Sequence, residues 1–274
     1  MKRDRLSFPA LLLVLLGAAV MVAPLVWTLL LSLKDNAELM RDSGAAFGGP
    51  YTLENYRAIL RGDMVFRWLL NSLIVSLGTT AGVLLLSSLA GFAFARLDFP
   101  FRRTLFVFVL LGLAIPEQAV ILPQHRLFAD LGLHNSYPGL ILPGLVGSFG
   151  VFFMTQYFRG LSRDLDEAAA LDGATTFQIF WRVLLPLTVP AQATLGVFTF
   201  LGSWNAYWWP LISATTADRF TLTIGLASAQ ANYAQTNGLG YLMAQAVFAS
   251  LPILIVYIIF QKHIVSAMAG TAVK

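Results

Sequence analysis

Residues 164–186 read DLDEAAALDGATTFQIFWRVLLP. This polar segment separates two charge-free stretches, 131–158 and 183–217, each long enough to cross a membrane as a helix of about 20 residues. Most packed helices are joined by only about 2–8 residues. We therefore interpret the segment as a docking surface for a soluble protein. On this interpretation the chain changes conformation, and a separate protein supplies the energy for the change.

Local signals divide this segment into two short helices. Asp164 can cap a helix start, with Glu167 three residues later completing a capping-box pattern. A run of alanines follows, and Gly173 is where that helix should end, because glycine adopts the left-handed conformation at little cost. Thr175 with Gln178 predicts a second start at once. The alternative is a solvated loop with its caps, which explains the capping residues but not the length of the unit.

Composition places the chain in a membrane. It is 57% hydrophobic and 12% charged, and the charged share is about half that of soluble domains. It has no cysteine, so disulfides and cysteine-ligated zinc are excluded. His125, His134 and His263 are far apart in sequence, which argues against a metal site. A net charge of +4 without a basic patch argues against nucleic acid.

The apolar runs predict an all-α membrane protein with six transmembrane helices. Residues 1–274 are expected to form a single transmembrane domain, with a cytoplasmic loop at 163–183 between the fourth and fifth spans. The polar residues at 211–242, between the fifth and sixth spans, are assigned to an external loop. The expected spans lie at about 10–32, 69–93, 104–123, 137–158, 186–210 and 243–261.

Lys and Arg residues in the short flanks predict the orientation. With the N-terminus in the cytoplasm, the inner side holds an excess of basic residues, clearest in the turn RLDFPFRR at 96–103. Both termini and the 164–186 segment then lie inside, in a bacterial or archaeal cytoplasmic membrane. The inner basic residues are Lys2, Arg3, Arg5, Arg96, Arg102, Arg103, Arg159, Arg163, Arg182, Lys262 and Lys274.

Motifs for ATP hydrolysis and other catalysis are absent from the sequence. No lysine follows a glycine, so a P-loop cannot form, and no catalytic triad or zinc-protease motif is present. The chain is therefore predicted to be no enzyme and to bind no cofactor itself. A proton-coupled secondary transporter is the alternative, and Glu117 is the acid it would use.

Candidates for a solute path lie near the outer ends of the third and fifth spans. Sugars bind aromatic faces together with hydrogen-bonding side chains, and the segment SWNAYWWPL at 203–211 offers both before Pro210, which is expected to break or end the helix. An aromatic belt at the membrane interface explains the tryptophans equally well. The path candidates are Trp204, Asn205, Tyr207, Trp208, Glu117 and Gln118, with Gln124 and Gln192 as further lining residues.

The sequence resembles the integral-membrane subunits of binding-protein-dependent ABC importers. Glu167-Ala168-Ala169, Gly173 and Val183-Leu184-Leu185-Pro186 match the family's cytoplasmic EAA signature in spacing. GFAFARLDFPFRR, NSYPGLILP, SWNAYWWPL and FQKHIVSAMAGTAVK extend the likeness to the carbohydrate-uptake branch, in particular the maltose-type second permease.

The resemblance implies a coupling helix that docks on an ATPase subunit. It implies two partner ATPase subunits, which bind ATP and Mg, and a second homologous permease. It also implies an extracytoplasmic solute-binding protein, which the stretch 227–240 could contact. Membrane lipid around the spans and a carbohydrate substrate complete the implied partners. The implied coupling residues are Glu167, Ala168, Ala169, Asp172, Gly173 and Thr175. The implied tail contacts are Gly270, Thr271, Val273 and Lys274.

Overall fold

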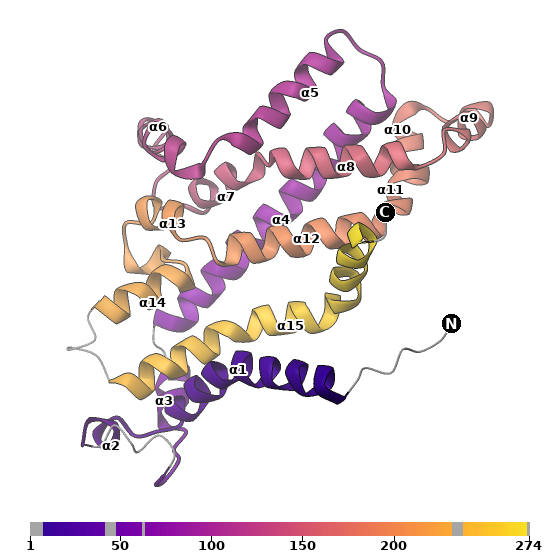
Figure 1. The fold of residues 1–274 in the computed structure, drawn as a ribbon. Coiled ribbons are helices and arrows are strands. Elements are labelled where there is room, and N and C mark those ends of the chain that lie inside the picture. Colours follow the sequence, from indigo (N-terminus) through magenta and orange to yellow (C-terminus); the bar gives the residue numbers. More distant parts are fainter. Residues whose placement is uncertain (1–7, 42–47, 62–63, 232–237, 273–274) are drawn as a thin grey trace. The chain divides into compact units, whose positions relative to one another are not determined.

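A computed structural model describes residues 8–41, 48–61, 64–231 and 238–272. Helices and loops make up these ranges, and no strand occurs within them. Figure 1 shows the helices in chain order. The chain divides into two compact units. One joins the residues up to Arg67 with Gly225–Leu251, and the other joins Trp68–Ile224 with the segment from Pro252 onward.

Three described helices are long and apolar enough to span a membrane: α1 (Phe8–Ser32), α4 (Met64–Arg96) and the Leu239–Gln261 part of α15 (Leu239–Ala272). Three further candidates are pairs of helices bent at a short break. The structure therefore offers up to six spans, and the predicted number is reached when each bent pair counts as one.

The third expected span, 104–123, is not one continuous helix. Helix α5 (Arg102–Leu111) ends in a 3₁₀ turn, η2 (Gly112–Ala114), and the axis then turns by 103° into α6 (Glu117–Asp130). The reason lies at Pro116, whose ring disfavours helical geometry in the preceding residue. Ile115 accordingly has extended angles, φ −87° and ψ 115°.

The fourth expected span is bent as well. Helices α7 (Tyr137–Leu145) and α8 (Ser148–Gly160) meet at 47°, across a short extended break at residues 146–147.

The fifth expected span begins after a bend and ends before Pro210. The short elements α10 (Thr176–Gln178), η3 (Ile179–Leu184, a π-helix) and α11 (Leu185–Leu187) precede a 76° bend into α12 (Val189–Trp204). The prediction that Pro210 breaks this helix is wrong. The helix ends at Trp204, and Pro210 lies inside the next helix, α13 (Trp208–Ser213), in a first turn that tolerates proline.

The loop expected at 211–242 contains helical structure. Beyond α13 lie a 3₁₀ turn, η4 (Ala217–Arg219), and helix α14 (Leu222–Ala231). Leu222 and Ile224 are 1% and 2% exposed, and burial of such side chains stabilises a helix that a polar composition alone does not predict. Residues 232–237 lie outside the described ranges.

A buried cluster of the larger unit joins α4, α8 and η3. Phe92 of α4 packs edge-on against Phe158 of α8 and lies 5.1 Å, centroid to centroid, from Phe180 of η3. Met154 and Leu184 are fully buried in the same cluster. This aromatic core anchors η3 on the helices that precede it.

Small residues let α4 approach α7 and α8 closely, as ordinary bundle packing requires. A Cβ on Gly91 would lie 2.9 Å from backbone atoms of Met154 and Thr155. One on Gly150 would lie 2.3 Å from the hydroxyl oxygen of Ser87. Packing therefore explains Gly91 and the Ser87–Gly150 pair.

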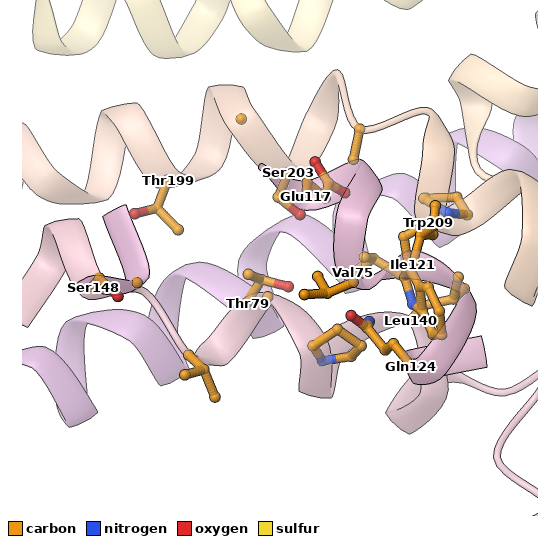
Figure 2. A pocket seen from close by; sticks show the side chains of 18 of the residues that line it. Val75, Thr79, Glu117, Ile121, Gln124, Leu140, Ser148, Thr199, Ser203 and Trp209 are labelled. Carbon is orange, nitrogen blue, oxygen red and sulfur yellow. The ribbon is translucent and has the colours of Figure 1, made fainter. Parts of the chain in front are cut away.

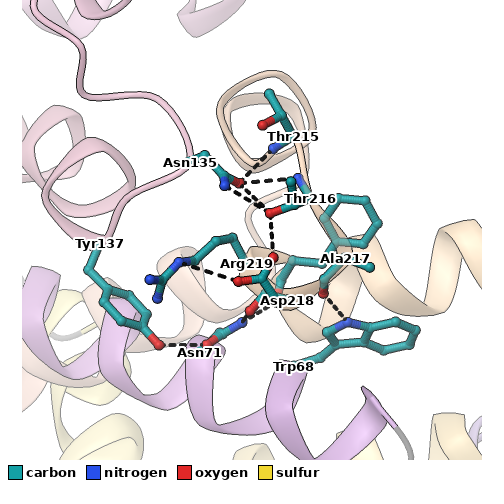
Figure 3. A network of polar contacts seen from close by, with 10 residues as sticks. Trp68, Asn71, Asn135, Tyr137, Thr215, Thr216, Ala217, Asp218 and Arg219 are labelled. Atoms are coloured by element: carbon teal, nitrogen blue, oxygen red, sulfur yellow. Dashed lines mark hydrogen bonds and ion pairs between the residues drawn. The ribbon is translucent and has the colours of Figure 1, made fainter.

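At the other end of this unit, a polar network joins the start of α7 to the segment after α13 (Figure 3). Asn135, at φ +56°, accepts hydrogen bonds from the backbone N–H groups of Thr215 and Thr216 at 3.0 and 3.1 Å. Asn71 of α4 donates to the carbonyl of Asp218 and accepts from the Tyr137 hydroxyl. The network holds the start of α7, the segment after α13 and α4 together.

The smaller unit adds α2 (Asn36–Arg41) and α3 (Glu54–Leu60) to the C-terminal part of α1. Lys34 is fully buried there, donates to the carbonyl of Gly48 and lies over the Tyr51 ring. Asn55 donates to the carbonyls of Ser32 and Lys34, each at 2.9 Å. These contacts satisfy the backbone where α1 ends.

Candidate functional site

The helix that carries the EAA sequence is α9 (Asp164–Leu171). Its start differs from the prediction, because Asp164 forms no side-chain cap. The backbone N–H groups of Asp166 and Glu167 donate instead to the carbonyl of Arg163, and the Ser162 hydroxyl accepts from the N–H of Asp164 at 3.3 Å. Arg163 thus takes the cap position, one residue earlier than expected.

The end of α9 confirms the predicted stop at Gly173. Gly173 has φ +78°, its N–H donates to the carbonyl of Ala170, and the N–H of Ala174 donates to that of Ala169. These two bonds form a Schellman motif, which ends a helix at a left-handed residue.

The predicted second start is also confirmed. Thr175 and Gln178 form a reciprocal capping box, with the N–H of Thr175 donating to the Gln178 side chain at 2.8 Å and the N–H of Gln178 to the Thr175 hydroxyl at 3.3 Å. Two defined helical segments therefore meet at Gly173, past the ends of α4 and α8 (Figure 1).

Most of the predicted coupling residues face solvent. Glu167, Ala168, Asp172, Gly173 and Thr175 are exposed, and Ala169 is half-buried. Two large apolar side chains stand beside them, Leu171 at 89% exposed and Phe177 at 67%.

Arg96 ties this exposed unit to the helical bundle. Its Nη2 atom donates to the carbonyl of Leu161 at 2.9 Å, and its Nε atom lies 3.3 Å from Oδ2 of Asp166. The Arg96 side chain is 6% exposed and that of Asp166 is 23% exposed. Sequence reasoning placed Arg96 only among the inner basic residues and missed this contact.

A cavity of about 580 Å³ lies between α4, α6, α7 and α12 (Figure 2). Its wall is mostly apolar, with a few polar groups, which is the usual character of a small-molecule site. Thr199 and Ser203 come from α12, Thr79 from α4, and Glu117 and Gln124 from α6. Trp209 and Ser148 also line it.

Of the predicted path residues, Glu117 lies in this cavity wall and the other five do not. Trp204 is 3% exposed and stacks on Phe200. The Asn205 amide donates to the carbonyl of Leu201 at 2.9 Å, at the end of α12. Tyr207 and Trp208 pack edge to face at the surface, and Gln118 is exposed.

Of the two further lining candidates, one lines the cavity and the other does not. Gln124 lines the cavity, whereas Gln192 bonds to Thr188 and faces an apolar groove elsewhere. Thr79, Thr199 and Ser203 were missed by the sequence reasoning. The neighbouring sequence does not mark them as cavity residues, because hydroxyl residues within apolar helices usually serve packing.

Some residues predicted to contact partner proteins lie outside the described part of the chain. Gly270 and Thr271 lie in α15, but no side chain beyond Gln261 is described, and Val273 and Lys274 lie outside the described residues. The stretch 227–240 is described except for residues 232–237. Among the residues that are placed, no three His, Asp or Glu side chains gather as a metal site would require.

The chain is similar to known proteins over most of its length. Residues 83–270 match the family described as the binding-protein-dependent transport system inner membrane component. The arabinooligosaccharides transport system permease protein AraQ of Bacillus subtilis (strain 168) is 39% identical over 92% of this chain and 90% of its own. The diacetylchitobiose uptake system permease protein NgcG of Streptomyces coelicolor is 32% identical over 94% of this chain and 85% of its own.

The fold is also similar to one chain of a bacterial ABC transporter involved in the import of the acidic polysaccharide alginate. The TM-score is 0.78, over 96% of this chain and 98% of that chain, at 23% identity.

The chain therefore belongs to the family of inner-membrane components of binding-protein-dependent transport systems. Within that family it is a non-catalytic permease subunit of an ABC importer, a class in which separate subunits hydrolyse ATP.

Proposed function

We propose that this permease moves a carbohydrate into the cytoplasm, in an importer with a second permease, two ATPase subunits that bind ATP and Mg, and an extracytoplasmic solute-binding protein. The permeases named above serve arabinooligosaccharides and diacetylchitobiose, which supports an oligosaccharide as the substrate class. The family membership does not favour the proton-coupled alternative.

The observation that carries the proposal is the exposed unit formed by α9, Gly173 and α10. A docking helix must be accessible and must not bend freely when force is applied. The Schellman motif and the capping box fix the two segments locally, while Leu171 and Phe177 offer apolar surface to a partner. We infer that Glu167, Ala168, Ala169, Asp172, Gly173 and Thr175 form the coupling contact.

The route from this contact to the bundle runs through buried groups. Asp166 is paired with Arg96 at the last turn of α4, and Phe180 packs on Phe92 and Phe158. To move a two-state equilibrium from 1:99 to 99:1, ATP binding must favour one bundle state by about 5.5 kcal/mol. Packed contacts of this kind can transmit such a bias, because they resist continuous deformation.

The 580 Å³ cavity is the proposed solute path. Hydroxyls of Thr79, Thr199 and Ser203 and the amide of Gln124 can bond sugar hydroxyls, and the Trp209 indole adds an aromatic wall. Glu117 begins α6, where the positive end of the helix dipole favours a carboxylate. In this role Glu117 accepts hydrogen bonds from the solute, and no proton coupling is required.

We place the α9 end of the protein in the cytoplasm, with both termini on that side. Residues 68–224 of the larger unit contain eight arginines. Six of them are expected on the cytoplasmic side, and two, Arg126 and Arg219, on the external side. Such an excess predicts the cytoplasmic side.

Substitution of Glu167 by Lys together with Gly173 by Pro tests the coupling role. The double variant should insert and pair with the second permease but lose ATP-driven uptake and association with the ATPase. Uptake at the wild-type rate in that variant would refute the proposal.

A further inference from the structure

A second cavity, of about 620 Å³, lies on the α9 side of the larger unit and is lined by five arginines. They come from the end of α4, the start of α5, the end of α8 and the residue before α9. No acidic side chain lines it. The arginines are Arg96, Arg102, Arg103, Arg159 and Arg163.

Two of these arginines are neutralised by carboxylates. Arg96 pairs with Asp166, and Arg102 pairs with Asp98 at 2.7 Å. Within the described part of the chain, no carboxylate lies within 4.0 Å of Arg103, Arg159 or Arg163. The cavity therefore holds three positive charges that no carboxylate of the described residues neutralises.

The backbone adds to this positive field. Helix α5 has ten residues, and its N-cap, Phe101, provides no side-chain cap. The positive end of the helix dipole thus lies beside Arg102 and Arg103. An anion in the cavity would receive both the guanidinium groups and this partial charge.

The cavity continues onto an apolar helix face. Arg103, Val107 and Leu111 stand at successive i, i+4 positions of α5, which share one face. Val107 lines the cavity and is 54% exposed, and Leu111 is also 54% exposed. Phe106, which the Arg159 guanidinium overlies at 5.1 Å, forms part of the same wall. A charged pocket that opens onto an apolar helix face fits an amphiphile better than a free anion.

We propose that this cavity binds the headgroup phosphate of an anionic phospholipid, whose acyl chains lie along the exposed face of α5. Basic pockets between spanning helices on the cytoplasmic side are suited to such headgroups. The arginines supply the charge-assisted hydrogen bonds that a phosphate requires. Because Arg96 also holds Asp166, the bound lipid lies next to the base of α9.

The test uses the purified importer complex in detergent and measures lipid binding, so its outcome does not depend on transport. Phosphatidylglycerol, phosphatidylcholine and inorganic phosphate are titrated separately and followed by native mass spectrometry and thermal unfolding. Wild-type complex should bind phosphatidylglycerol more tightly than phosphatidylcholine, and inorganic phosphate should not replace it. An equal response to inorganic phosphate would overturn the assignment to lipid.

The variant Arg103→Gln with Arg163→Gln should bind phosphatidylglycerol about 30-fold more weakly, since each arginine near an anionic surface contributes about five-fold. The matched control, Arg57→Gln with Arg61→Gln, removes the same charge from exposed ion pairs with Glu54 at α3 and its C-cap, and should bind as the wild type does. Equal affinity in the two double variants would overturn the proposal.

A labelling experiment on the wild-type complex keeps the proposal testable if the arginine variant does not fold. Phosphatidylglycerol with a photoactivatable headgroup should label peptides that contain residues 94–107 or 159–163. Labelling confined to other segments would contradict the site.

Discussion

The Nε atom of Arg96 lies 3.3 Å from Oδ2 of Asp166, which joins the last turn of α4 to the first turn of α9. The pair is mostly shielded from water, and Arg96 also holds the carbonyl of Leu161. It is therefore the polar link between the exposed helix and the membrane bundle.

Substitution of Asp166 by Asn should uncouple the two parts without removing the docking surface. The change removes the negative charge that faces the mostly buried Arg96 guanidinium, so the ion pair is lost. ATPase association should persist while sugar uptake per ATP hydrolysed falls. Asp164→Asn is the matched control, since Asp164 is exposed and has no ion pair in the described structure, and it should leave the uptake ratio unchanged. Equal ratios in both variants would show that the link carries no force.

Substitution of Gly173 by Ala should strain the joint between α9 and α10. A Cβ there meets nothing within 4 Å, so only the positive φ of +78° opposes it. The left-handed conformation costs about 1–2 kcal/mol for a residue with a Cβ. ATP-driven uptake should fall, and Gly173→Asn should fall less because asparagine tolerates this conformation.

Gly160→Ala provides the control for that experiment. It also has open space around its Cβ, but its φ is not positive, so uptake should be unchanged. A loss of uptake as large as that of Gly173→Ala would assign the effect to something other than backbone conformation.

Substitution of Gly91 by Ala should destabilise the contact of α4 with α8. The new Cβ would lie 2.9 Å from backbone atoms of Met154 and Thr155, which cannot rotate away. Overpacking of this kind costs about 1–3 kcal/mol. Thermal unfolding of the complex should shift down, and more than for Gly82→Ala, whose nearest neighbour is the flexible side chain of Leu145. A smaller shift for Gly91→Ala would contradict the packing.

Substitution of Thr199 by Trp should obstruct the cavity between α4, α6, α7 and α12. The indole would occupy space that the solute needs, so uptake should fall severely while the ATPase remains bound. Phe198→Trp is the control on the neighbouring residue, which is 49% exposed and does not line the cavity. If both variants transported equally well, this cavity would not be the solute path.

The sequence predicts the features that depend on neighbouring residues. Gly173, Thr175 and Gln178 fix the two-helix unit through local backbone bonds, and the structure contains those bonds. The break at Pro116 also had a local cause, but a count of apolar residues passes over a proline and cannot show a bend.

The cavity and the Arg96–Asp166 link could not be predicted in the same way. Thr79 and Thr199 are 120 positions apart in the sequence, and only helix packing brings them to one cavity. Asn205 shows the reverse case, in which a residue predicted to contact sugar does not line the cavity. Its amide donates to the carbonyl four residues earlier. Composition shows which residue types are present, whereas packing decides which space they face.

Cross-linking from a single introduced cysteine tests the central claim most directly. The chain has no cysteine, so Ala168→Cys, at an exposed position of α9, provides one defined thiol. In the assembled importer it should cross-link to the ATPase subunit, with a yield that changes between the nucleotide-free and ATP-bound states, while Thr215→Cys at the opposite end should not. Absence of any cross-link from position 168 to the ATPase in every nucleotide state would contradict the account.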